Sequence, residues 1–520
     1  MRERLEVDAV VVGAGPAGLA AAWRLRQLAR SEGRDVSVLI LEKAAEPGDQ
    51  VLSGAVIDPA SLERLAGDDR SWADLLRPVA GEAVYWLEEA AARKLPWVPR
   101  PLQNRGFWVG SLGKLVRWLA ERVEAAGGEI ACSCPAVELV WEGSRVAGVL
   151  VKDFGRDRSG RPRPNFTPGP EVRAHVTLLA EGVRGTLSEA AVRRCELRRG
   201  KSPPRYAVGV KELWESPGAM PGGEVWHTVG YPQEEGESGG GFCYSLGRNV
   251  LSLGLVAEIL PNRRPPDPHR LLQAWKRHPL IQERLKGGRR LAYGARALPE
   301  GGWEAAPRLF ADGLLLLGDA AGLLDAARLK GIHLAVASGM AAAEAAWEAL
   351  SAGDTSAARL ARYEEVLAAA PEFDAFRRSR RLRERWASRL RLARRLWPVG
   401  GTDRTASAAN DRMQESEPEE DRSASVAFAS IAYEEEQPSP IRILRPDLCA
   451  TECRERHGNP CRWFCPAGVF AVVGGDGPGI RVEVQPGNCL HCKTCEVADP
   501  FEAVRWEPPE GGQGPRWRDM

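Results

Sequence analysis

The start of the chain has two continuous apolar runs, separated by a glycine-rich turn and by a stretch in which apolar residues recur at helical spacing. One apolar run covers residues 7–12, and apolar side chains then recur at helical spacing over residues 19–29. A second apolar run, Val36 to Leu41, ends at an acidic residue. This order predicts a buried strand, a tight turn, a helix and a second strand, which is how a doubly wound α/β fold begins.

The turn between these elements carries the glycines of a dinucleotide site. Gly13, Gly15 and Gly18 let the backbone approach a pyrophosphate, whose charge would sit at the N-terminus of the following helix. Glu42, directly after the second run, is placed to accept hydrogen bonds from a ribose diol. The turn alone does not separate NAD from FAD.

A second pattern favours FAD. Residues 314–317 form an apolar run that ends in Gly318 and Asp319, and a helix is expected from Gly331 to Ala346. The run resembles the distal motif of glutathione-reductase-type flavoproteins, in which the carboxylate faces the ribityl chain. An ordinary helix cap is the alternative for Asp319. A third apolar strand ends at Gly182, where such folds return to the cofactor, so we predict bound FAD.

Cysteines near the C-terminus predict an iron–sulfur cluster. Two short strands are expected at residues 468–473 and 480–484, on either side of a glycine-rich turn. The cysteines around them are Cys465, Cys489, Cys492 and Cys495. A C-x-x-C-x-x-C triplet with a distant Cys-Pro is typical of a four-iron cluster. A zinc site built from the same thiols is the alternative, although zinc sites usually pair two C-x-x-C units.

The same pattern predicts that a second cluster is lost. Bacterial two-cluster ferredoxins carry the cysteine run twice, and the cysteine before each proline ligates the other run's cluster. Asp499 stands where the second Cys-Pro would fall, and only Cys461 of the first run's own triplet is at a ligand position. No role is assigned to Cys449 or Cys453.

Composition limits the classes of protein to which the chain could belong. The chain has 520 residues, enough for two or three domains, and its 44% hydrophobic content is ordinary for a globular protein. A net charge of +1 gives no electrostatic signature for nucleic acid, and we expect no nucleic-acid partner. No apolar run is long enough to span a bilayer. Eleven cysteines, several in a cluster motif, fit a reducing compartment better than a disulfide framework.

Two segments after the flavin motifs differ from the rest in composition. Residues 399–440 are rich in Ser, Ala, Glu and Asp, and they are predicted to be a linker that is mobile at least from 402 to 423. The preceding segment, Phe376 to Trp397, carries ten arginines, and its apolar residues share one helical face. It is either an amphipathic helix on anionic lipid or a solvated surface helix.

Further motifs resemble those of one family, the electron transfer flavoprotein:ubiquinone oxidoreductases. These motifs are Leu52 to Pro59, Tyr293 to Gly302, Lys330 to His333, Cys465 to Val469, Asn488 to Cys495 and Pro509 to Gly512. The resemblance runs almost from end to end, and several independent motifs in one order are hard to obtain by chance.

The resemblance implies a fold and a domain order. The fold class is α/β, with a glutathione-reductase-type FAD-binding Rossmann fold formed by residues 1–200 and 290–398. An inserted α+β quinone-binding domain is expected at 201–289, and a ferredoxin-like 4Fe-4S domain at 441–520 after the linker. Ser53 and Gly54 join the predicted FAD contacts.

The resemblance also implies an electron route. Reduced electron transfer flavoprotein would pass electrons through the cluster and FAD to ubiquinone or menaquinone. The protein would lie on the membrane surface, peripheral on the cytoplasmic side, without a spanning helix. Gly239 and Gly240 are expected to contact the quinone, although Ser238 replaces the aromatic residue that usually opens this motif.

Two other functions remain open at this point. A flavin-dependent isoprenoid reductase of the geranylgeranyl reductase type shares the flavin fold, but the ferredoxin end and the motif Tyr293 to Gly302 disfavour it. A non-enzymatic redox sensor or electron-carrying adaptor is the other. His333 and His491 are expected to complete hydrogen bonds near the cofactors rather than to act as proton relays or ligands.

Four other cysteines lack metal-site spacing. Cys132, Cys134, Cys195 and Cys243 are expected to be buried small hydrophobes. The segments Phe107 to Val109 and Leu112 to Leu119 form an apolar edge that faces lipid or packs as core.

Overall fold

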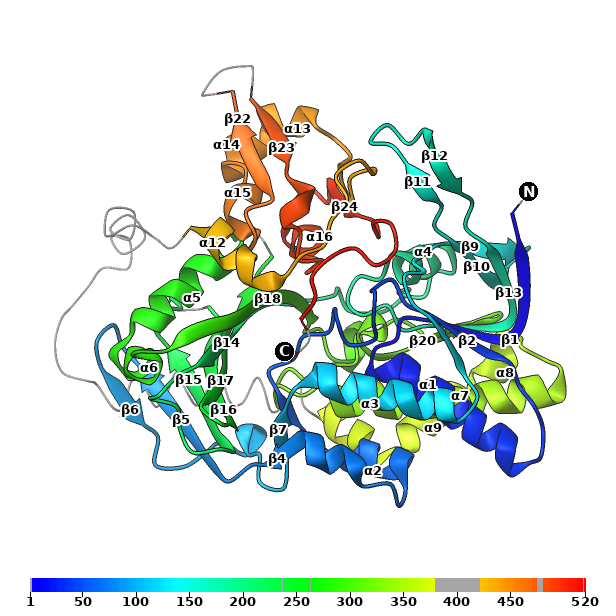
Figure 1. Cartoon of the computed structure of the whole chain (residues 1–520), viewed down its shortest axis with the longest axis horizontal. Coiled ribbons are helices and arrows are strands. Elements are labelled where there is room, and N and C mark those ends of the chain that lie inside the picture. The colour runs from blue at the N-terminus through cyan, green and yellow to red at the C-terminus, as the bar shows by residue number, and fades with distance from the viewer. Residues whose placement is uncertain (1, 235–236, 262, 379–420, 475–479, 518) are drawn as a thin grey trace.

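Three parts of the chain pack around a common centre (Figure 1). The computed structural model describes residues 2–234, 237–261, 263–378, 421–474, 480–517 and 519–520. A helix-covered sheet and a second, mostly antiparallel sheet lie side by side. A smaller cysteine-rich module, drawn in orange and red, covers the junction between them.

The first sheet contains the predicted nucleotide fold. Its parallel strands are β1 (Arg4–Val12), β2 (Val38–Leu41), β8 (Glu129–Ala131), β13 (Glu171–Leu179) and β20 (Leu314–Leu316). Antiparallel strands extend it: β9 (Ala136–Glu142), β10 (Arg145–Val151) and β19 (Phe310–Ala311). The apolar ends of β1, β2 and β13 are fully buried, as parallel strands covered on both faces require.

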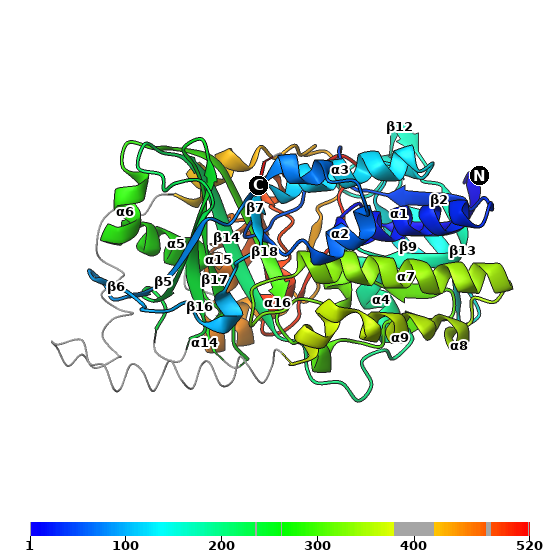
Figure 2. The same cartoon turned by 90° about the horizontal axis from the view of Figure 1, so that it is seen from below.

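Helices enclose this sheet. They are α1 (Pro16–Ser31), α3 (Leu112–Ala125), α4 (Thr186–Arg194), α7 (Ile332–Ala352), α8 (Ala357–Leu360) and α9 (Arg362–Ala369). Figure 2 shows α1 and α7 side by side, and they pack tightly at Gly339, where an added Cβ would lie 2.3 Å from the carbonyl oxygen of Ala17. A short helix, α2 (Ala60–Ala66), and a small sheet lie beside them. The strands of that sheet are β3 (Val56–Ile57), β4 (Leu76–Pro78) and β7 (Trp108–Gly110).

The second sheet has seven strands in the order β18-β14-β17-β16-β15-β5-β6. Their bounds are β5 (Gly81–Leu87), β6 (Ala92–Lys94), β14 (Tyr206–Glu215), β15 (Glu224–Gly230), β16 (Gly239–Gly247), β17 (Val250–Ile259) and β18 (Arg289–Pro299). Helices α5 (Pro268–Arg277) and α6 (Pro279–Leu285) pack on this part. Residues 81–94 belong to this sheet although the sequence grouped them with the flavin-binding part, because β5 pairs in parallel with β15.

The cysteine-rich module is built from short elements. Its strands are β21 (Ile441–Ile443), β22 (Phe470–Val473), β23 (Arg481–Val484) and β24 (Val504–Trp506), and its helices are α12 (Arg422–Val426), α13 (Asp447–Ala450), α14 (Glu452–His457), α15 (Cys461–Phe464) and α16 (Thr494–Ala498). Strand pairs β21-β24 and β22-β23 are antiparallel, and the second is the predicted hairpin. A further hairpin, β11 (Phe154–Arg156) and β12 (Pro162–Thr167), projects from the first sheet.

The C-terminal segment ties the module to both sheets. The backbone N–H of Gly512 donates to the carbonyl oxygen of Lys43 at 2.9 Å, and the indole of Trp517 donates to the carbonyl oxygen of Tyr293 at 3.0 Å. The hydroxyl of Tyr293 in turn donates to the carbonyl oxygen of Pro466 at 2.8 Å. The module is therefore packed onto the two sheets rather than attached only by a linker.

The structure corrects one expectation and decides one open alternative. Residues 421–440 were expected to belong to the linker, which was predicted to be mobile at least from 402 to 423, but Ser425, Val426 and Ala429 are buried, and Arg422 forms an ion pair with Asp267. The segment Leu112 to Leu119 packs as core, because most of its side chains in α3 are buried against the first sheet. The basic segment ending at Trp397 lies outside the described residues from position 379 onward.

Candidate functional site

A long cavity runs between the two sheets and under the cysteine-rich module. It is lined by the glycine turn after β1, the end of β2, the start of α7, strands β14 and β16, and residues that follow the cysteine triplet. Most of the residues that the sequence selected for FAD lie along its wall: Gly13, Gly15, Glu42, Ser53, Gly54, Gly182, Asp319 and Gly331. The predicted FAD contacts therefore converge from six separate segments of the chain.

The glycine turn fits a close ligand approach. A Cβ added at Gly13 would lie 2.5 Å from the carbonyl oxygen of Ala180, and one at Gly18 would lie 2.1 Å from that of Gly13. A Cβ at Gly15 would meet no atom of the chain within 4 Å. Gly13 and Gly18 are thus required by packing, whereas Gly15 leaves open space at the N-terminus of α1, where a pyrophosphate would bind.

Glu42 is held with its carboxylate at the cavity wall. The backbone N–H of Ala14 donates to Oε2 at 2.8 Å, and that of Ala44 donates to Oε1 at 2.8 Å. These bonds fix the carboxylate beside the glycine turn, while its remaining acceptor sites face the cavity. This placement fits a ribose diol.

Asp319 lies farther along the same cavity. Burial raises the pKa of its carboxyl to about 6, against the opposing effect of Arg296. The helix-cap alternative is not observed, since the N-cap of α7 is Gly331 and no side chain caps it. Gly318 lies behind Asp319, where its backbone N–H donates to Ser338 Oγ at 3.0 Å. A buried carboxyl facing open space fits a ribityl hydroxyl partner.

The second sheet supplies polar groups that sequence reasoning missed. Phe242 and Tyr244 on β16 and Lys211 on β14 line the cavity. The hydroxyl of Tyr244 is hydrogen-bonded to Nε2 of buried His227 at 2.7 Å. A lysine inside the otherwise apolar start of β14 was a visible signal, because charged residues are rarely buried without a partner.

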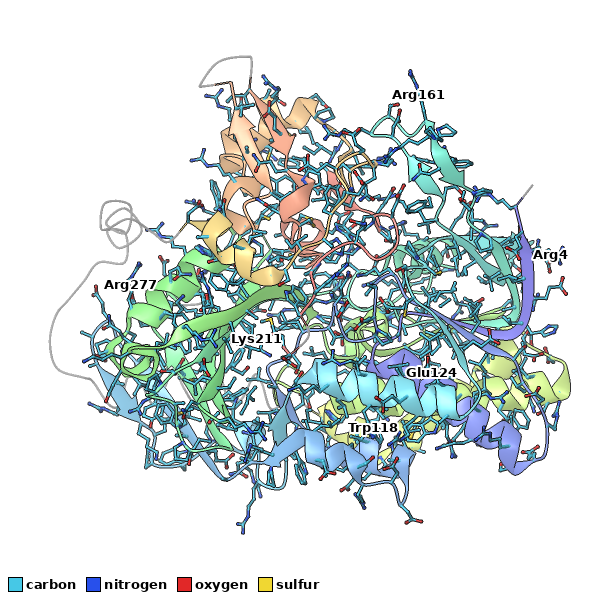
Figure 3. All side chains as sticks on the ribbon, in the orientation of Figure 1. Arg4, Trp118, Glu124, Arg161, Lys211 and Arg277 are labelled. Atoms are coloured by element: carbon cyan, nitrogen blue, oxygen red, sulfur yellow. The ribbon has the colours of Figure 1, made fainter. Side chains whose placement is uncertain are left out.

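Lys211 is paired with a glycine on each of the two neighbouring strands. Its registered partners on the adjacent strands are Gly254 and Gly294. A Cβ at Gly254 would meet the ring of Phe242, and one at Gly294 would meet Trp517. Lys211 is 2% exposed, and burial lowers its pKa from 10.5 to about 7. In the described part of the chain its side chain makes no hydrogen bond or ion pair (Figure 3 labels it near the centre).

The residues selected for quinone contact lie behind this wall. A Cβ at Gly239 would lie 2.2 Å from the carbonyl oxygen of Val256, and one at Gly240 would lie 2.4 Å from that of Thr228. Both glycines allow close strand packing at the start of β16, and the cavity lining begins two residues later, at Phe242.

The four predicted cluster ligands share one buried cluster of side chains. Cys465, Cys489, Cys492 and Cys495 are all less than 9% exposed and belong to the same core. Burial raises the pKa of Cys489 to about 12, and the neighbouring thiols Cys492 and Cys465 add to the effect. Backbone N–H groups of Ala467 and Val469 donate to Cys465. Such buried, mutually close sulfurs fit an iron–sulfur cluster.

No group of three or more His, Cys, Asp or Glu side chains in the described ranges forms a site for a single metal ion. Cys132, Cys134 and Cys195 are partly buried, while Cys243 is fully buried, so the expectation of buried cysteines holds fully only for Cys243.

The predicted cluster ligands adjoin the cavity that the predicted FAD contacts line. His491, between the first two cysteines of the triplet, lines the cavity, and its Nδ1 is hydrogen-bonded to Gln50 Oε1 at 3.2 Å. The backbone N–H of Ala297 donates to the carbonyl oxygen of Cys492 at 2.8 Å, and the preceding Arg296 also lines the cavity. One histidine and one hydrogen-bonded strand therefore join the two predicted redox sites.

The second predicted histidine has a different environment. His333 is buried at the start of α7, and neither of its ring nitrogens has a hydrogen-bond partner within the described chain. Burial lowers its pKa to about 4.

Family models match three parts of the chain. A model described as "Electron transfer flavoprotein-ubiquinone oxidoreductase, 4Fe-4S" matches residues 419–518, and one described as "ETF-QO, ubiquinone-binding" matches 206–298. A model of an NAD(P)-binding Rossmann-like domain matches 11–64. The first match starts before α12, which agrees with the packing of residues 421–440 into the module.

Curated proteins match over the full length. The electron transfer flavoprotein-ubiquinone oxidoreductase of Pseudomonas aeruginosa is 35% identical, with 100% of both chains covered. The mitochondrial protein of that name from Mus musculus is 34% identical over 99% of this chain and 89% of its own. A geranylgeranyl bacteriochlorophyll reductase-like structure from Thermoplasma acidophilum has a TM-score of 0.54 at 21% identity, covering 72% and 85% of the two chains, and this likeness shows the fold alone.

Proposed function

The chain belongs to the electron transfer flavoprotein-ubiquinone oxidoreductase family, and from this premise we propose how its residues carry electrons to quinone. Reduced electron transfer flavoprotein is the donor, a four-iron cluster and FAD are the redox centres, and quinone is the acceptor. The observation that carries the route is the direct contact of the cysteine module with the flavin cavity through His491.

We assign the cluster to Cys465, Cys489, Cys492 and Cys495. Their burial excludes water, and backbone N–H donors to sulfur stabilise negative charge on the ligands. We assign the FAD contacts to the eight cavity-wall residues named above. Gly18 and Gly318 do not line the cavity, and they allow the close packing of the turns that do. FAD, when bound there, supplies the redox chemistry that links the cluster to the quinone.

The chain's own contribution at the quinone end is charge and exclusion of water. Lys211 places an amine in an apolar section of the cavity, where its protonated form would stabilise the negative charge that arrives with electrons. Tyr244, oriented by His227, offers a hydroxyl hydrogen bond on the same wall. Gly239 and Gly240 allow β16 to pack tightly, so that Phe242 and Tyr244 reach the cavity.

The quinone tail has an exit beside α7. Leu329 lines the cavity and is 46% exposed, so the cavity reaches the surface there. We infer that this mouth faces the membrane, with the protein peripheral on the cytoplasmic side and the basic segment 376–397 as a second contact. No helix in the described ranges has the length and apolar character needed to cross a bilayer.

Liposome flotation tests this membrane contact. Leu329→Asp is expected to weaken binding to vesicles that contain anionic lipid, while Leu291→Asp, at an exposed leucine on β18 that does not line the cavity, leaves binding unchanged. Equal flotation of both variants and the native chain would place the membrane contact elsewhere.

One redox experiment tests the route as a whole. The anaerobically purified protein is reduced with electron transfer flavoprotein, and flavin absorbance and the cluster's paramagnetic resonance are followed while a short-chain quinone is added. Reoxidation of both centres by the quinone supports the proposal. Centres that become reduced but do not react with quinone would contradict it and would favour the redox-adaptor function.

A further inference from the structure

The cysteine-rich module contains an internal repeat that includes more than the four assigned ligands. Cys461 is followed four residues later by Cys465 and Pro466, and Cys495 is followed four residues later by Asp499 and Pro500. In both copies the first cysteine lies on a short helix, α15 or α16, and the second ligand position lies directly at or after its end. Asp499 is therefore the counterpart of the cluster ligand Cys465.

The backbone around the two counterpart residues is arranged in the same way. Cys465 accepts hydrogen bonds from the backbone N–H groups two and four residues later. Asp499 accepts from Phe501, two residues later, at 3.4 Å, from Ala503, four residues later, and from Val504 at 3.1 Å. The local fold that presents a cluster ligand at position 465 thus presents a carboxylate at position 499.

Three further cysteines gather near this carboxylate. Cys449 lies on α13, Cys453 on α14 and Cys461 at the start of α15. Buried Asn459 joins the three helices, because its side-chain amide donates to the carbonyl oxygen of Cys449 at 2.8 Å and its backbone N–H donates to that of Cys453 at 3.5 Å. The Cys461 thiol in turn contacts the carbonyl oxygen of Asn459 at 3.9 Å.

Left-handed backbone at the end of α14 makes this gathering possible. Gly458 has φ of 64° and Asn459 has φ of 56°, so the chain reverses and returns Cys461 toward the two earlier cysteines. The spacing of four and eight residues differs from the regular ferredoxin triplet, which is why the sequence pattern assigned no role to Cys449 and Cys453 and predicted that a second cluster is lost.

The charges at this place also favour an added cation. The thiol of Cys461 is within electrostatic range of Cys449, Cys453 and Asp499. Arg445 is the cation that acts on Asp499. Thiolates and a carboxylate close together are unfavourable unless iron or another metal balances their charge.

We propose that Cys449, Cys453, Cys461 and Asp499 hold a second iron–sulfur cluster in this chain. Soft thiolate ligands select iron–sulfur clusters or zinc, and the repeat relation to the first ligand set selects the cluster. Like the first set, the second contains no three side chains that form a single-ion site in the described residues. Cys449 and Cys461 are partly exposed, so this cluster lies nearer the surface than the first. It accepts one electron from the reduced donor and passes it to the buried cluster.

Iron, acid-labile sulfide and paramagnetic resonance of the anaerobically purified holoprotein test the proposal. We expect about eight iron atoms per chain rather than about four, and a reduced spectrum that shows magnetic coupling between two clusters. Cys453→Ala is expected to lose about half of the iron and the coupling, while flavin absorbance and the first cluster's signal persist. Cys195→Ala, at a partly buried cysteine of the flavin-binding part, is the matched control and is expected to change neither.

A second variant separates ligation from folding. Asp499→Cys is expected to keep the iron content and to alter the resonance spectrum of the second cluster, because a fourth thiolate replaces the carboxylate. About four iron atoms in the native protein, with no spectral effect of either variant, would overturn the proposal. Stoichiometric zinc that is lost in Cys453→Ala would also overturn it. None of these readouts depends on quinone turnover, so a failure of this proposal can be distinguished from a failure of the proposed electron route.

Discussion

The proposed flavin site depends on residues without side chains, whereas the proposed first cluster site depends on four cysteine side chains. At Gly15 any side chain would enter the space left for the ligand, and at Gly18 it would clash with Gly13. In the module the backbone can vary as long as buried sulfurs meet, and α16 supplies one of them in only five residues. The two redox centres should therefore respond to opposite kinds of substitution, namely additions in one region and deletions in the other.

Deleting one sulfur should have the largest effect. Cys495→Ala is expected to abolish the resonance signal of the first cluster and to destabilise the module, because cluster binding is coupled to folding. Iron analysis and anaerobic resonance spectra measure this. Cys243→Ala, at a fully buried cysteine of β16, is the control and should keep the cluster. A full first-cluster signal in Cys495→Ala would show that this thiol is not a ligand.

In the cavity, adding a side chain at a glycine should be as damaging to cofactor binding as deleting a cysteine sulfur is in the module. Gly15→Val is expected to reduce bound FAD at least about tenfold with little effect on the stability of the flavin-free chain, since a Cβ there meets no protein atom. Gly18→Ala is expected to lower the free energy of unfolding by roughly 1–3 kcal/mol, because its Cβ overlaps the backbone. Flavin absorbance and denaturant unfolding distinguish the two. Normal FAD content in Gly15→Val would contradict the placement of the pyrophosphate.

Removing an ionisable group from the cavity wall should have an intermediate effect. Lys211→Met is expected to lower the flavin reduction potential by on the order of 30 mV, because it removes a positive charge that favours the reduced state. Spectroelectrochemistry measures the shift, and Lys286→Met on the exposed end of α6 is the control. An unchanged potential would mean that Lys211 does not act on the electrons.

The same residue predicts a pH dependence. The pKa of Lys211 is about 7 in the folded chain and 10.5 when it is free, so the unfolded state binds more protons between these values. Stability therefore rises as pH increases from about 7 to about 10, and Lys211→Met should flatten part of this rise. Thermal unfolding across this pH range measures it. An unaltered slope would show that the lysine is not desolvated.

A hydrogen bond that joins the regions should have the smallest effect. Tyr293→Phe removes the donor to the carbonyl oxygen of Pro466 and is expected to cost about 1 kcal/mol of stability. Denaturant unfolding followed by cluster absorbance measures it. Tyr85→Phe is the control, because the Tyr85 hydroxyl makes no hydrogen bond in the described chain. Equal losses of unfolding free energy in both variants would show that the Tyr293 hydroxyl does not stabilise the contact between β18 and the module.

Much of the flavin half could be predicted from the sequence. The glycine turn, the runs at 36–41 and 314–317 and the helix after Gly331 are all observed, because each depends on residues adjacent in the chain. The ferredoxin hairpin was predicted for the same reason. Apolar periodicity and turn glycines act over a few residues, so they can be recognised without a structure.

The part of the cavity wall that the second sheet forms could not be predicted in this way. Lys211 lines the cavity but was not selected, whereas Gly239 and Gly240 were selected and are not among the lining residues; their contact with quinone stays a prediction. Which face of a strand meets a cavity depends on the neighbouring strands, and β14 finds its partners about 40 and 80 residues away in β17 and β18.

The sequence by itself determined the fold class, the two redox cofactors and the family, because their signals are short motifs with defined spacing. Only the tertiary structure placed residues 81–94 in the second sheet, ordered residues 421–440 and brought Cys449, Cys453 and Cys461 toward Asp499. These arrangements depend on strand register, a left-handed turn and side-chain burial, which act between residues that are far apart in the chain.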